Sequence, residues 1–405
     1  MLKLTPASQA RPKGKRPIIG LAVAGGGPLG AIYELGALQA IDEAIDGVHM
    51  HNLDVYVGVS SGSFLTASLA NRVTATQMGR IFMGAPDAEF SFQPELFLRP
   101  ALREYLDRAM ALPSVIVDVI REAINNPSGL GVERLDSIAR LIPTGLFDNQ
   151  MIEQFLSRVL TRQGRSNDFR DLSAKLRIVA VELDSGHVVR FGEPGLDDVP
   201  ISTAVQASAA LPGLYPPVEI NQSFYVDGAL RRTLHASVAL NEGADLLIGI
   251  NPLVPYDGDH ASSSQSGKSR MMRGGLPMVL SQTFRALIQS RMQVGMAKYE
   301  KEYPAVGMML VEPNRNDEQM FFTNIFSYSS RNELVDHAYR STRAELLARA
   351  DELEPFLETY DLGLNRTRLE KTCSFHETMD KQAPYLAPLG NDLARTLDSL
   401  ERLIR

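Results

Sequence analysis

The five residues from Gly58 to Gly62, Gly-Val-Ser-Ser-Gly, constrain the fold of this chain more than any other segment. They follow a β-branched and aromatic run at residues 54–58 and precede an Ala- and Leu-rich run at residues 63–71, which predict a strand and a helix. A serine at such a sharp strand-to-helix turn exposes its Oγ beside the free N–H groups of the helix start. The pattern predicts a nucleophile at Ser60, although a plain turn between a strand and a helix would fit the same five residues.

A second unit of strand, glycine loop and helix is predicted near the N-terminus. The apolar run 18–24 leads into Gly25-Gly26-Gly27-Pro28-Leu29-Gly30, and a helical pattern follows at residues 31–44. Consecutive glycines let the backbone pass close to a ligand, and the N–H groups of a helix start favour negative charge. In acyl transfer this charge is the tetrahedral oxyanion, and one fixed donor lowers the barrier by about 3 to 4 kcal/mol. We predict an oxyanion hole in this loop, with Gly26 and Gly27 as the leading donors.

The same loop also fits the Gly-x-Gly-x-x-Gly pattern of dinucleotide-binding proteins through Gly25, Gly27 and Gly30. That fold requires an acidic residue at the end of the second strand, where it holds the ribose hydroxyls. Here the second strand ends in Gly-Val-Ser-Ser-Gly, and Asp54 lies at its start. A dinucleotide-binding protein therefore remains an alternative function.

A third segment, Phe224 to Ala229, places Asp227 at the end of an apolar run and directly before Gly228. A carboxylate there could act as a base, while Asp-Gly after a strand is also a common turn. In this order the three segments resemble the patatin-like phospholipase family. Two further segments, at residues 181–186 and 207–213, support the resemblance, which extends over about residues 17–250.

The resemblance implies a three-layer α/β/α fold with a largely parallel central sheet. It also implies that residues 25–30 form the oxyanion hole, that Ser60 is the nucleophile and that Asp227 completes a catalytic dyad without histidine. This chain departs from the family pattern at Leu29, where most members have Arg or Lys, and after Asp227, where the usual Asn-x-Pro is missing. The loss of the basic residue would favour a less anionic ester or slow the turnover of phospholipids.

A carboxylate can take the proton of a serine only in a dry cavity, where desolvation raises its basicity. We therefore expect Asp227 to be buried, to take the Ser60 proton during attack and to return it to the leaving alcohol. A Ser-Asp-His triad is the alternative within serine hydrolysis, because chain order permits it. The histidines after Asp227 are His235, His260, His337 and His376.

Composition narrows the classes of partner. The net charge of −7 argues against general nucleic-acid binding, and the single cysteine, Cys373, excludes an internal disulfide and fits a reducing, cytoplasmic compartment. Without Cys pairs or a close His cluster we expect neither a metal site nor a cofactor. No uncharged apolar stretch reaches membrane-spanning length, so we expect a cytoplasmic protein that meets its lipid ester substrate in solution or peripherally at a membrane.

Strand patterns near residues 18, 54, 176, 224 and 246 alternate with helical patterns, which predicts an α/β fold. We expect a flexible basic tail (1–16), a catalytic domain (17–255) with a helical insert (about 83–146), a mobile loop (256–275) and a mainly helical C-terminal region (276–405). In that last region the helical patterns lie at residues 276–299, 331–359 and 391–405. The first of them suits a core-facing helix, which we favour, or a basic amphipathic helix on a lipid surface.

The function expected from these features is a serine acyl hydrolase acting on lipid carboxyl esters, either a phospholipase A-type enzyme or a broader lipid esterase. Besides the dinucleotide-binding alternative, Leu29 leaves open a lipid-binding scaffold with low turnover on the same fold.

Overall fold

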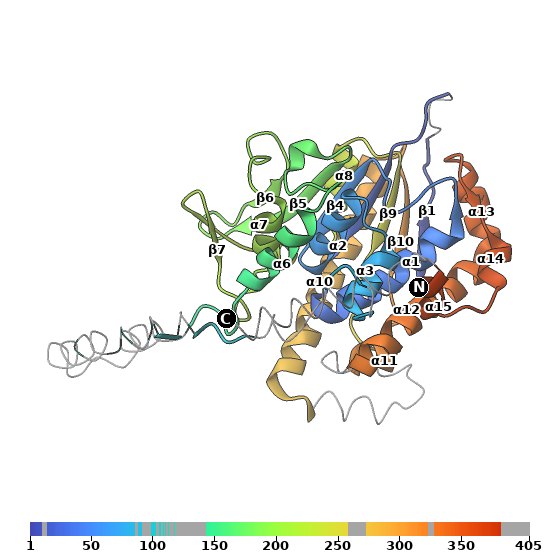
Figure 1. The fold of residues 1–405 in the computed structure, drawn as a ribbon. Helices are drawn as coiled ribbons and strands as arrows, with labels where there is room; N and C mark the ends of the chain where they lie inside the picture. The colour runs from blue at the N-terminus through green and yellow to red at the C-terminus, as the bar shows by residue number, and fades with distance from the viewer. Residues whose placement is uncertain are drawn as a thin grey trace.

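The computed structural model describes residues 1–9, 14–85, 88–90, 143–257, 273–322 and 328–381, with a few positions between 99 and 117. A nine-stranded sheet with the order β1-β10-β9-β2-β4-β5-β8-β7, and β6 beside β5, runs through its centre (Figure 1). The strands are β1 (Leu2–Thr5), β2 (Ile19–Val23), β4 (Val55–Val59), β5 (Lys175–Glu182), β6 (Val188–Phe191), β7 (Val218–Ile220), β8 (Ser223–Asp227), β9 (Leu246–Ile250) and β10 (Gly307–Val311). A separate two-stranded ribbon pairs β3 (Ile45–Asp46) with β11 (Gly363–Leu364).

The centre of the sheet is parallel and its margins are antiparallel. Strands β10, β9, β2, β4 and β5 run in one direction, whereas β1, β6, β7 and β8 pair antiparallel to their neighbours. All five strand segments predicted from the sequence are present, as β2, β4, β5, β8 and β9. The predicted α/β fold with a largely parallel sheet is thereby confirmed.

Helices cover both faces of the sheet, because the central strands are apolar on both sides. Along β2, Leu21 and Val23 join one hydrophobic cluster, while Ala22 joins another on the opposite face. The first cluster packs against α1 (Gly27–Ala44), α2 (Ser61–Ala70), α3 (Ala75–Phe82), α6 (Gln150–Leu160), α7 (Ile201–Ser208), α12 (Tyr328–Ala348) and α13 (Ala350–Glu358). The second packs against α8 (Ala236–Asn241) and α10 (Gly275–Glu302). This is the expected three-layer α/β/α arrangement (Figure 1).

The remaining short elements lie between these helices and strands or near the C-terminus. They are the 3₁₀ turns η2 (Phe169–Asp171) and η3 (Gly228–Leu230) and the helices α11 (Glu318–Phe322), α14 (Arg366–Glu370) and α15 (Phe375–Lys381).

The prediction of a flexible tail at residues 1–16 is wrong for its first residues. Leu2–Thr5 form β1, which pairs with β10, and Leu2 is buried. The alternation Leu-Lys-Leu-Thr has the period of a strand with one buried face, and β10 offers it an open edge. The basic composition of the segment hid this short pattern.

The C-terminal region is joined to the central sheet and to α1. Its strand β10 pairs with β9 inside the central sheet, and α12 packs along α1. Between these two helices Arg343 donates to the Glu43 carboxylate at 2.7 Å, and the Tyr339 hydroxyl donates to the same oxygen at 2.6 Å. The predicted helices at 276–299 and 331–359 correspond to α10 and to α12 with α13. Most of the predicted insert at 83–146, most of the loop at 256–275 and the helix at 391–405 lie outside the described residues.

Candidate active site

Ser60 occupies a strained elbow between β4 and α2. Its φ of 50° lies in the left-handed region, which a non-glycine residue adopts at an energetic cost. The glycines on both sides are required by space. A Cβ on Gly58 would collide with Thr66, and a Cβ on Gly62 would collide with the carbonyl oxygens of Val23 and Ala24. The predicted turn from strand to helix is therefore present, and it leaves the Ser60 side chain 8% exposed.

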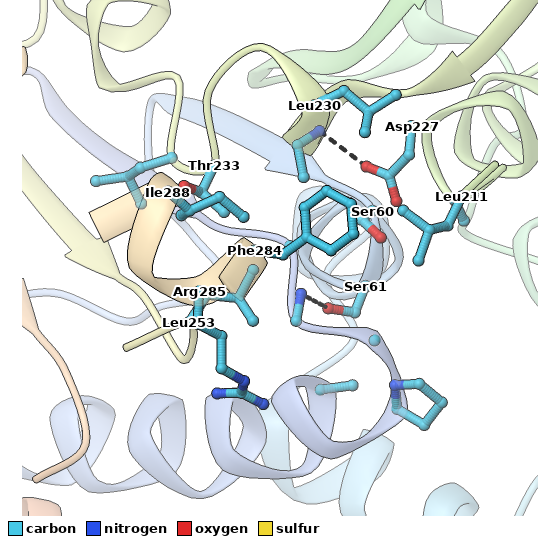
Figure 2. Close-up of a pocket in the computed structure, with 18 of the residues that line it drawn as sticks. Ser60, Ser61, Leu211, Asp227, Leu230, Thr233, Leu253, Phe284, Arg285 and Ile288 are labelled. Atoms are coloured by element: carbon cyan, nitrogen blue, oxygen red, sulfur yellow. Dashed lines mark hydrogen bonds between the residues drawn. The ribbon is translucent and has the colours of Figure 1, made fainter. Parts of the chain in front are cut away.

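The register of the sheet brings Asp227 to the same level as Ser60. Val59 of β4 lies opposite Val179 of β5, so Ser60 follows at the level of Ala180, and Asp227 of β8 lies opposite Ala180 from the other side. One strand, β5, thus lies between Ser60 and Asp227, and the backbones of β4 and β8 on its two sides are about 10 Å apart. Figure 2 shows both side chains directed into one cavity and toward each other.

The segment 207–213 accepts hydrogen bonds from the backbone N–H groups of both Ser60 and Asp227. The Ser208 hydroxyl accepts the N–H of Ser60 at 2.9 Å and donates to the carbonyl of Val179 at 2.6 Å. The carbonyl of Ala210 accepts the N–H of Asp227 at 3.0 Å. Ser208 is not among the predicted site residues, although the segment around it is one of the two that support the family resemblance.

Asp227 is 2% exposed, and burial raises the pKa of its carboxyl to about 6. The shift is opposed by the N–H of Ala229, which donates to Oδ1 at 2.8 Å, and by a hydrogen bond with the Ser60 side chain. No positive side chain is among the causes of this shift. The carboxylate is therefore ionised at neutral pH and more basic than an exposed aspartate.

The glycine loop offers fewer free donors than its sequence predicts. The N–H of Gly26 donates to the Ser61 hydroxyl at 2.9 Å, and the N–H of Gly30 donates to the carbonyl of Gly26 inside α1. The N–H groups of Gly25 and Gly27 have no acceptor among the described residues, and the same holds for Ser61 at the start of α2. Free donors thus come from the loop and from the residue after Ser60, an arrangement typical of oxyanion holes.

Behind the loop lies a buried acid that the sequence did not single out. Glu34 on α1 is fully buried, and neither of its carboxyl oxygens has a hydrogen-bond partner among the described residues. Burial raises the pKa of Glu34 well above its ordinary value, and the nearby Ser61 hydroxyl opposes the shift. Ser61 thus lies between the Glu34 carboxyl and the N–H of Gly26. The repeated serine in Gly-Val-Ser-Ser-Gly was the available signal for Ser61.

Ser60 and Asp227 open into a cavity of about 1250 Å³. Its lining is mainly apolar, with one part between α1, α2, α6 and α7 and another beneath α10. Representative apolar side chains are Phe64, Phe147 and Ile152 in the first part and Leu280, Phe284 and Leu287 in the second. This volume exceeds that of ordinary small-molecule sites, and the lining suits long apolar ligands.

The histidines of the alternative triad are placed differently. His235 lines the cavity, but its Nε2 faces the carbonyl of Gly228 at 3.2 Å, and burial lowers its pKa to about 4. His337 pairs with Asp317 at 2.6 Å, and neither His337 nor His376 lines the cavity. His260 lies outside the described residues.

Asp54, the acid considered for ribose binding, lies at the opposite edge of the sheet from the glycine loop. Its carboxylate accepts the N–H of Ile19 at 2.9 Å, at the amino ends of β2 and β4. Within the described ranges, His, Cys, Asp and Glu side chains form no group of three that could hold a metal ion. None of the helices in the described part of the chain combines the length and apolar character needed to cross a bilayer.

Comparisons with known proteins agree with these motifs. A sequence model described as patatin-like phospholipase matches residues 21–240, which include the glycine loop, Ser60 and Asp227 and end before α10. The chain is similar to VipD from Legionella pneumophila, with 12% identity over 89% of this chain and 82% of that chain and a TM-score of 0.31. It is also similar to the ExoU–SpcU complex from the type III secretion system of Pseudomonas aeruginosa, with 15% identity, coverage of 95% and 76%, and a TM-score of 0.27.

Proposed function

Since the chain belongs to the patatin-like phospholipase family, we propose that it hydrolyses lipid carboxyl esters with Ser60 as nucleophile and Asp227 as general base. The observation that carries this proposal is the joint position of the two side chains. A serine in a strained elbow and a buried carboxylate with a raised pKa share one apolar cavity. A nucleophile beside a base of raised pKa is the arrangement that acyl transfer requires.

In the first half-reaction, Ser60 Oγ attacks the ester carbonyl carbon while its proton passes to the Asp227 carboxylate. The negative charge that develops on the carbonyl oxygen is received by free backbone N–H groups, for which Gly25, Gly27 and Ser61 are the candidates. Collapse of the tetrahedral intermediate breaks the bond to the alcohol oxygen, and Asp227 returns the proton to that oxygen. The products of this half are an acyl-Ser60 ester and a free alcohol.

In the second half-reaction, water attacks the acyl-Ser60 carbonyl and loses a proton to Asp227. The same backbone donors receive the oxyanion, and the proton returns to Ser60 Oγ as the fatty acid leaves. His235 is no rival base here, because its ring nitrogen is engaged with Gly228 and its pKa is lowered rather than matched to neutral pH.

The surroundings of the site support a lipid as the substrate. The cavity is large enough and apolar enough for acyl chains. Leu280, Phe284 and Leu287 on α10 line it and are about half-exposed. Apolar residues at a cavity mouth are suited to contact with a lipid surface. We therefore place the reaction peripherally at a membrane, in the cytoplasmic compartment that a single cysteine favours.

Labelling with a fluorophosphonate probe tests the nucleophile. The wild-type protein is expected to be labelled on Ser60 and to release p-nitrophenol from a short-chain ester, whereas Ser60→Ala should do neither. Ser68→Ala is a matched control that should keep both labelling and release, since it removes a buried hydroxyl of α2 that donates to the carbonyl of Phe64 and does not line the cavity. Labelling that persists in Ser60→Ala would refute the assignment, and a folded wild type without labelling or release would leave a lipid-binding protein.

A further inference from the structure

The cavity lining carries many more positive than negative side chains. Asp227 is the sole acid in its described lining, and no lysine lines it. Five arginines line it, namely Arg231, Arg232, Arg285, Arg291 and Arg331. The glycine loop, Gly-Gly-Gly-Pro-Leu-Gly, contributes no charge. A mainly apolar cavity with an excess of positive charge is suited to an apolar ligand that carries an anionic group.

Arg285 on α10 is the arginine placed best to receive such a group. Its side chain is 9% exposed, and its guanidinium lies 3.5 Å from the carbonyl oxygen of Pro252 and 3.3 Å from that of Val254. The ring of Pro252 packs against the glycine loop, since a Cβ on Gly26 would lie 2.5 Å from its Cγ. Pro252 therefore contacts both the guanidinium and the glycine loop, and Arg285 and this loop line the same cavity.

The intramolecular partners of Arg285 do not neutralise its charge. Its Nε lies 3.5 Å from the hydroxyl of Ser281, and its guanidinium lies over the ring of Phe321 at 5.1 Å. No carboxylate pairs with it among the described residues, and its second terminal nitrogen has no acceptor there. Burial lowers the pKa of Arg285 to about 10, which still leaves the group charged at neutral pH.

The alternative for Arg285 is a purely structural role, in which it anchors α10 to the segment around Pro252. Contacts of 3.3 to 3.5 Å lie at the long limit of hydrogen bonding, and neutral carbonyls repay little of the cost of burying a cation. The next inward residue of the helix, Gln289, is 3% exposed, and its amide atoms have no partner in the described part of the chain. The inward stripe of α10 thus carries polar groups whose hydrogen bonds are incomplete.

We propose that Arg285 binds the phosphate of a glycerophospholipid substrate whose ester reaches Ser60. Its planar guanidinium can donate two parallel hydrogen bonds to phosphate oxygens, and the exposed Arg231 and Arg291 attract the same group at the mouth. This inference rests on the proposed function and adds the head-group chemistry. It assigns phospholipid selectivity to a helix that lies after the matched residues 21–240.

The test compares two substrates with equal acyl chains, dioctanoylphosphatidylglycerol and dioctanoylglycerol, in detergent micelles. In Arg285→Gln the ratio of kcat/KM for the phospholipid to that for the neutral lipid should fall by about 10- to 100-fold, the loss typical of a hydrogen-bonded charge. Lys298→Gln is the matched control, because it removes a positive charge from the same helix outside the cavity. A ratio that is equal in wild type and Arg285→Gln overturns the proposal.

Binding provides a readout that does not depend on turnover. Calorimetric titration of Ser60→Ala with dioctanoylphosphatidylglycerol should give binding that is about 10- to 100-fold weaker in Ser60→Ala/Arg285→Gln. Inorganic phosphate separates the two sources of the anion. If phosphate alone binds in an Arg285-dependent way while the lipid binds both proteins equally, the site holds free phosphate and the head-group assignment is wrong. If lipid binding depends on Arg285 but the wild-type protein does not hydrolyse the lipid, the result counts against the proposed function and not against the phosphate site.

Discussion

Asp227→Asn should make the protein inactive and more stable at the same time. The side chain is fully buried, and its carboxyl has a pKa of about 6 against 3.8 for an ordinary aspartate. Because the folded-state pKa is raised, the folded protein binds the proton more tightly than the unfolded chain, and stability falls as pH rises from about 4 to about 6. A shift of about two pKa units corresponds to about 3 kcal/mol that the ionised carboxylate takes from folding.

The asparagine avoids that cost and keeps the local hydrogen bonds. Its amide oxygen can accept the N–H of Ala229, and its amide nitrogen can donate to Ser60 Oγ. The free energy of unfolding of Asp227→Asn should therefore exceed that of the wild type by about 1 kcal/mol near pH 4.5 and by up to about 3 kcal/mol near pH 8. Hydrolysis should fall by about 1000-fold or more, because the amide cannot take the proton of Ser60.

Denaturant unfolding at several pH values measures the first effect, and a p-nitrophenyl ester assay measures the second. Ser60→Ala is the control, since it abolishes activity but keeps the buried carboxylate; because it also removes the hydrogen bond that lowers the pKa of Asp227, its stability should fall with rising pH at least as much as that of the wild type. If Asp227→Asn is no more stable than the wild type near pH 8, and the free energies of unfolding of the two proteins change with pH in parallel, the buried carboxylate does not destabilise the fold when it is ionised. The basis for its assignment as a base would then be lost.

Three further results are expected. The kcat/KM of the wild type should rise with pH through an apparent pKa of about 6, because only ionised Asp227 is a base. A pH profile with a single inflection near 4, the pKa of His235, would contradict this assignment. His235→Gln retains a donor for the carbonyl of Gly228 and should keep activity within about 10-fold of the wild type, whereas a loss equal to that of Ser60→Ala would establish a triad. Gly62→Ala forces a Cβ against two carbonyl oxygens and should destabilise the fold by more than about 3 kcal/mol. Its control is Gly295→Ala on α10, where the nearest atoms are 3.8 Å away and stability should change by less than about 1 kcal/mol. Equal thermal midpoints for the two variants would refute the crowding at Gly62.

Strands β2 and β4 were predictable because each is a short apolar run that leads into a glycine-containing turn. Burial on both faces imposes this pattern on residues 19–23 and 55–59. β1 was missed because four residues of alternating pattern carry little signal beside a basic composition. Its partner β10 lies about three quarters of the chain length away, since Leu2 pairs with Val311, so pairing between them depends on tertiary structure that local patterns do not encode.

The sequence singled out Ser60 and Asp227 as candidate catalytic residues, whereas it did not predict the groups that surround them. The sequence predicted Gly26 and Gly30 in the oxyanion loop, but the N–H groups of both are occupied, one by Ser61 and one by the first turn of α1. Which N–H groups remain free depends on side chains that meet only in the folded chain. Ser208 and Arg285 likewise reach the site from segments about 150 and 225 residues after Ser60.

Asp227 and Arg285 are opposite charges that line one cavity and yet do not pair. The causes of the raised pKa of Asp227 include no arginine, and those of the lowered pKa of Arg285 include no carboxylate. A salt bridge between them would lower the pKa of Asp227 and weaken it as a base. Their separation keeps the carboxylate basic and leaves the guanidinium without an anion. A molecule with an ester at one end and a phosphate at the other meets both requirements, because its phosphate would compensate Arg285 while its ester carbonyl is presented to Ser60.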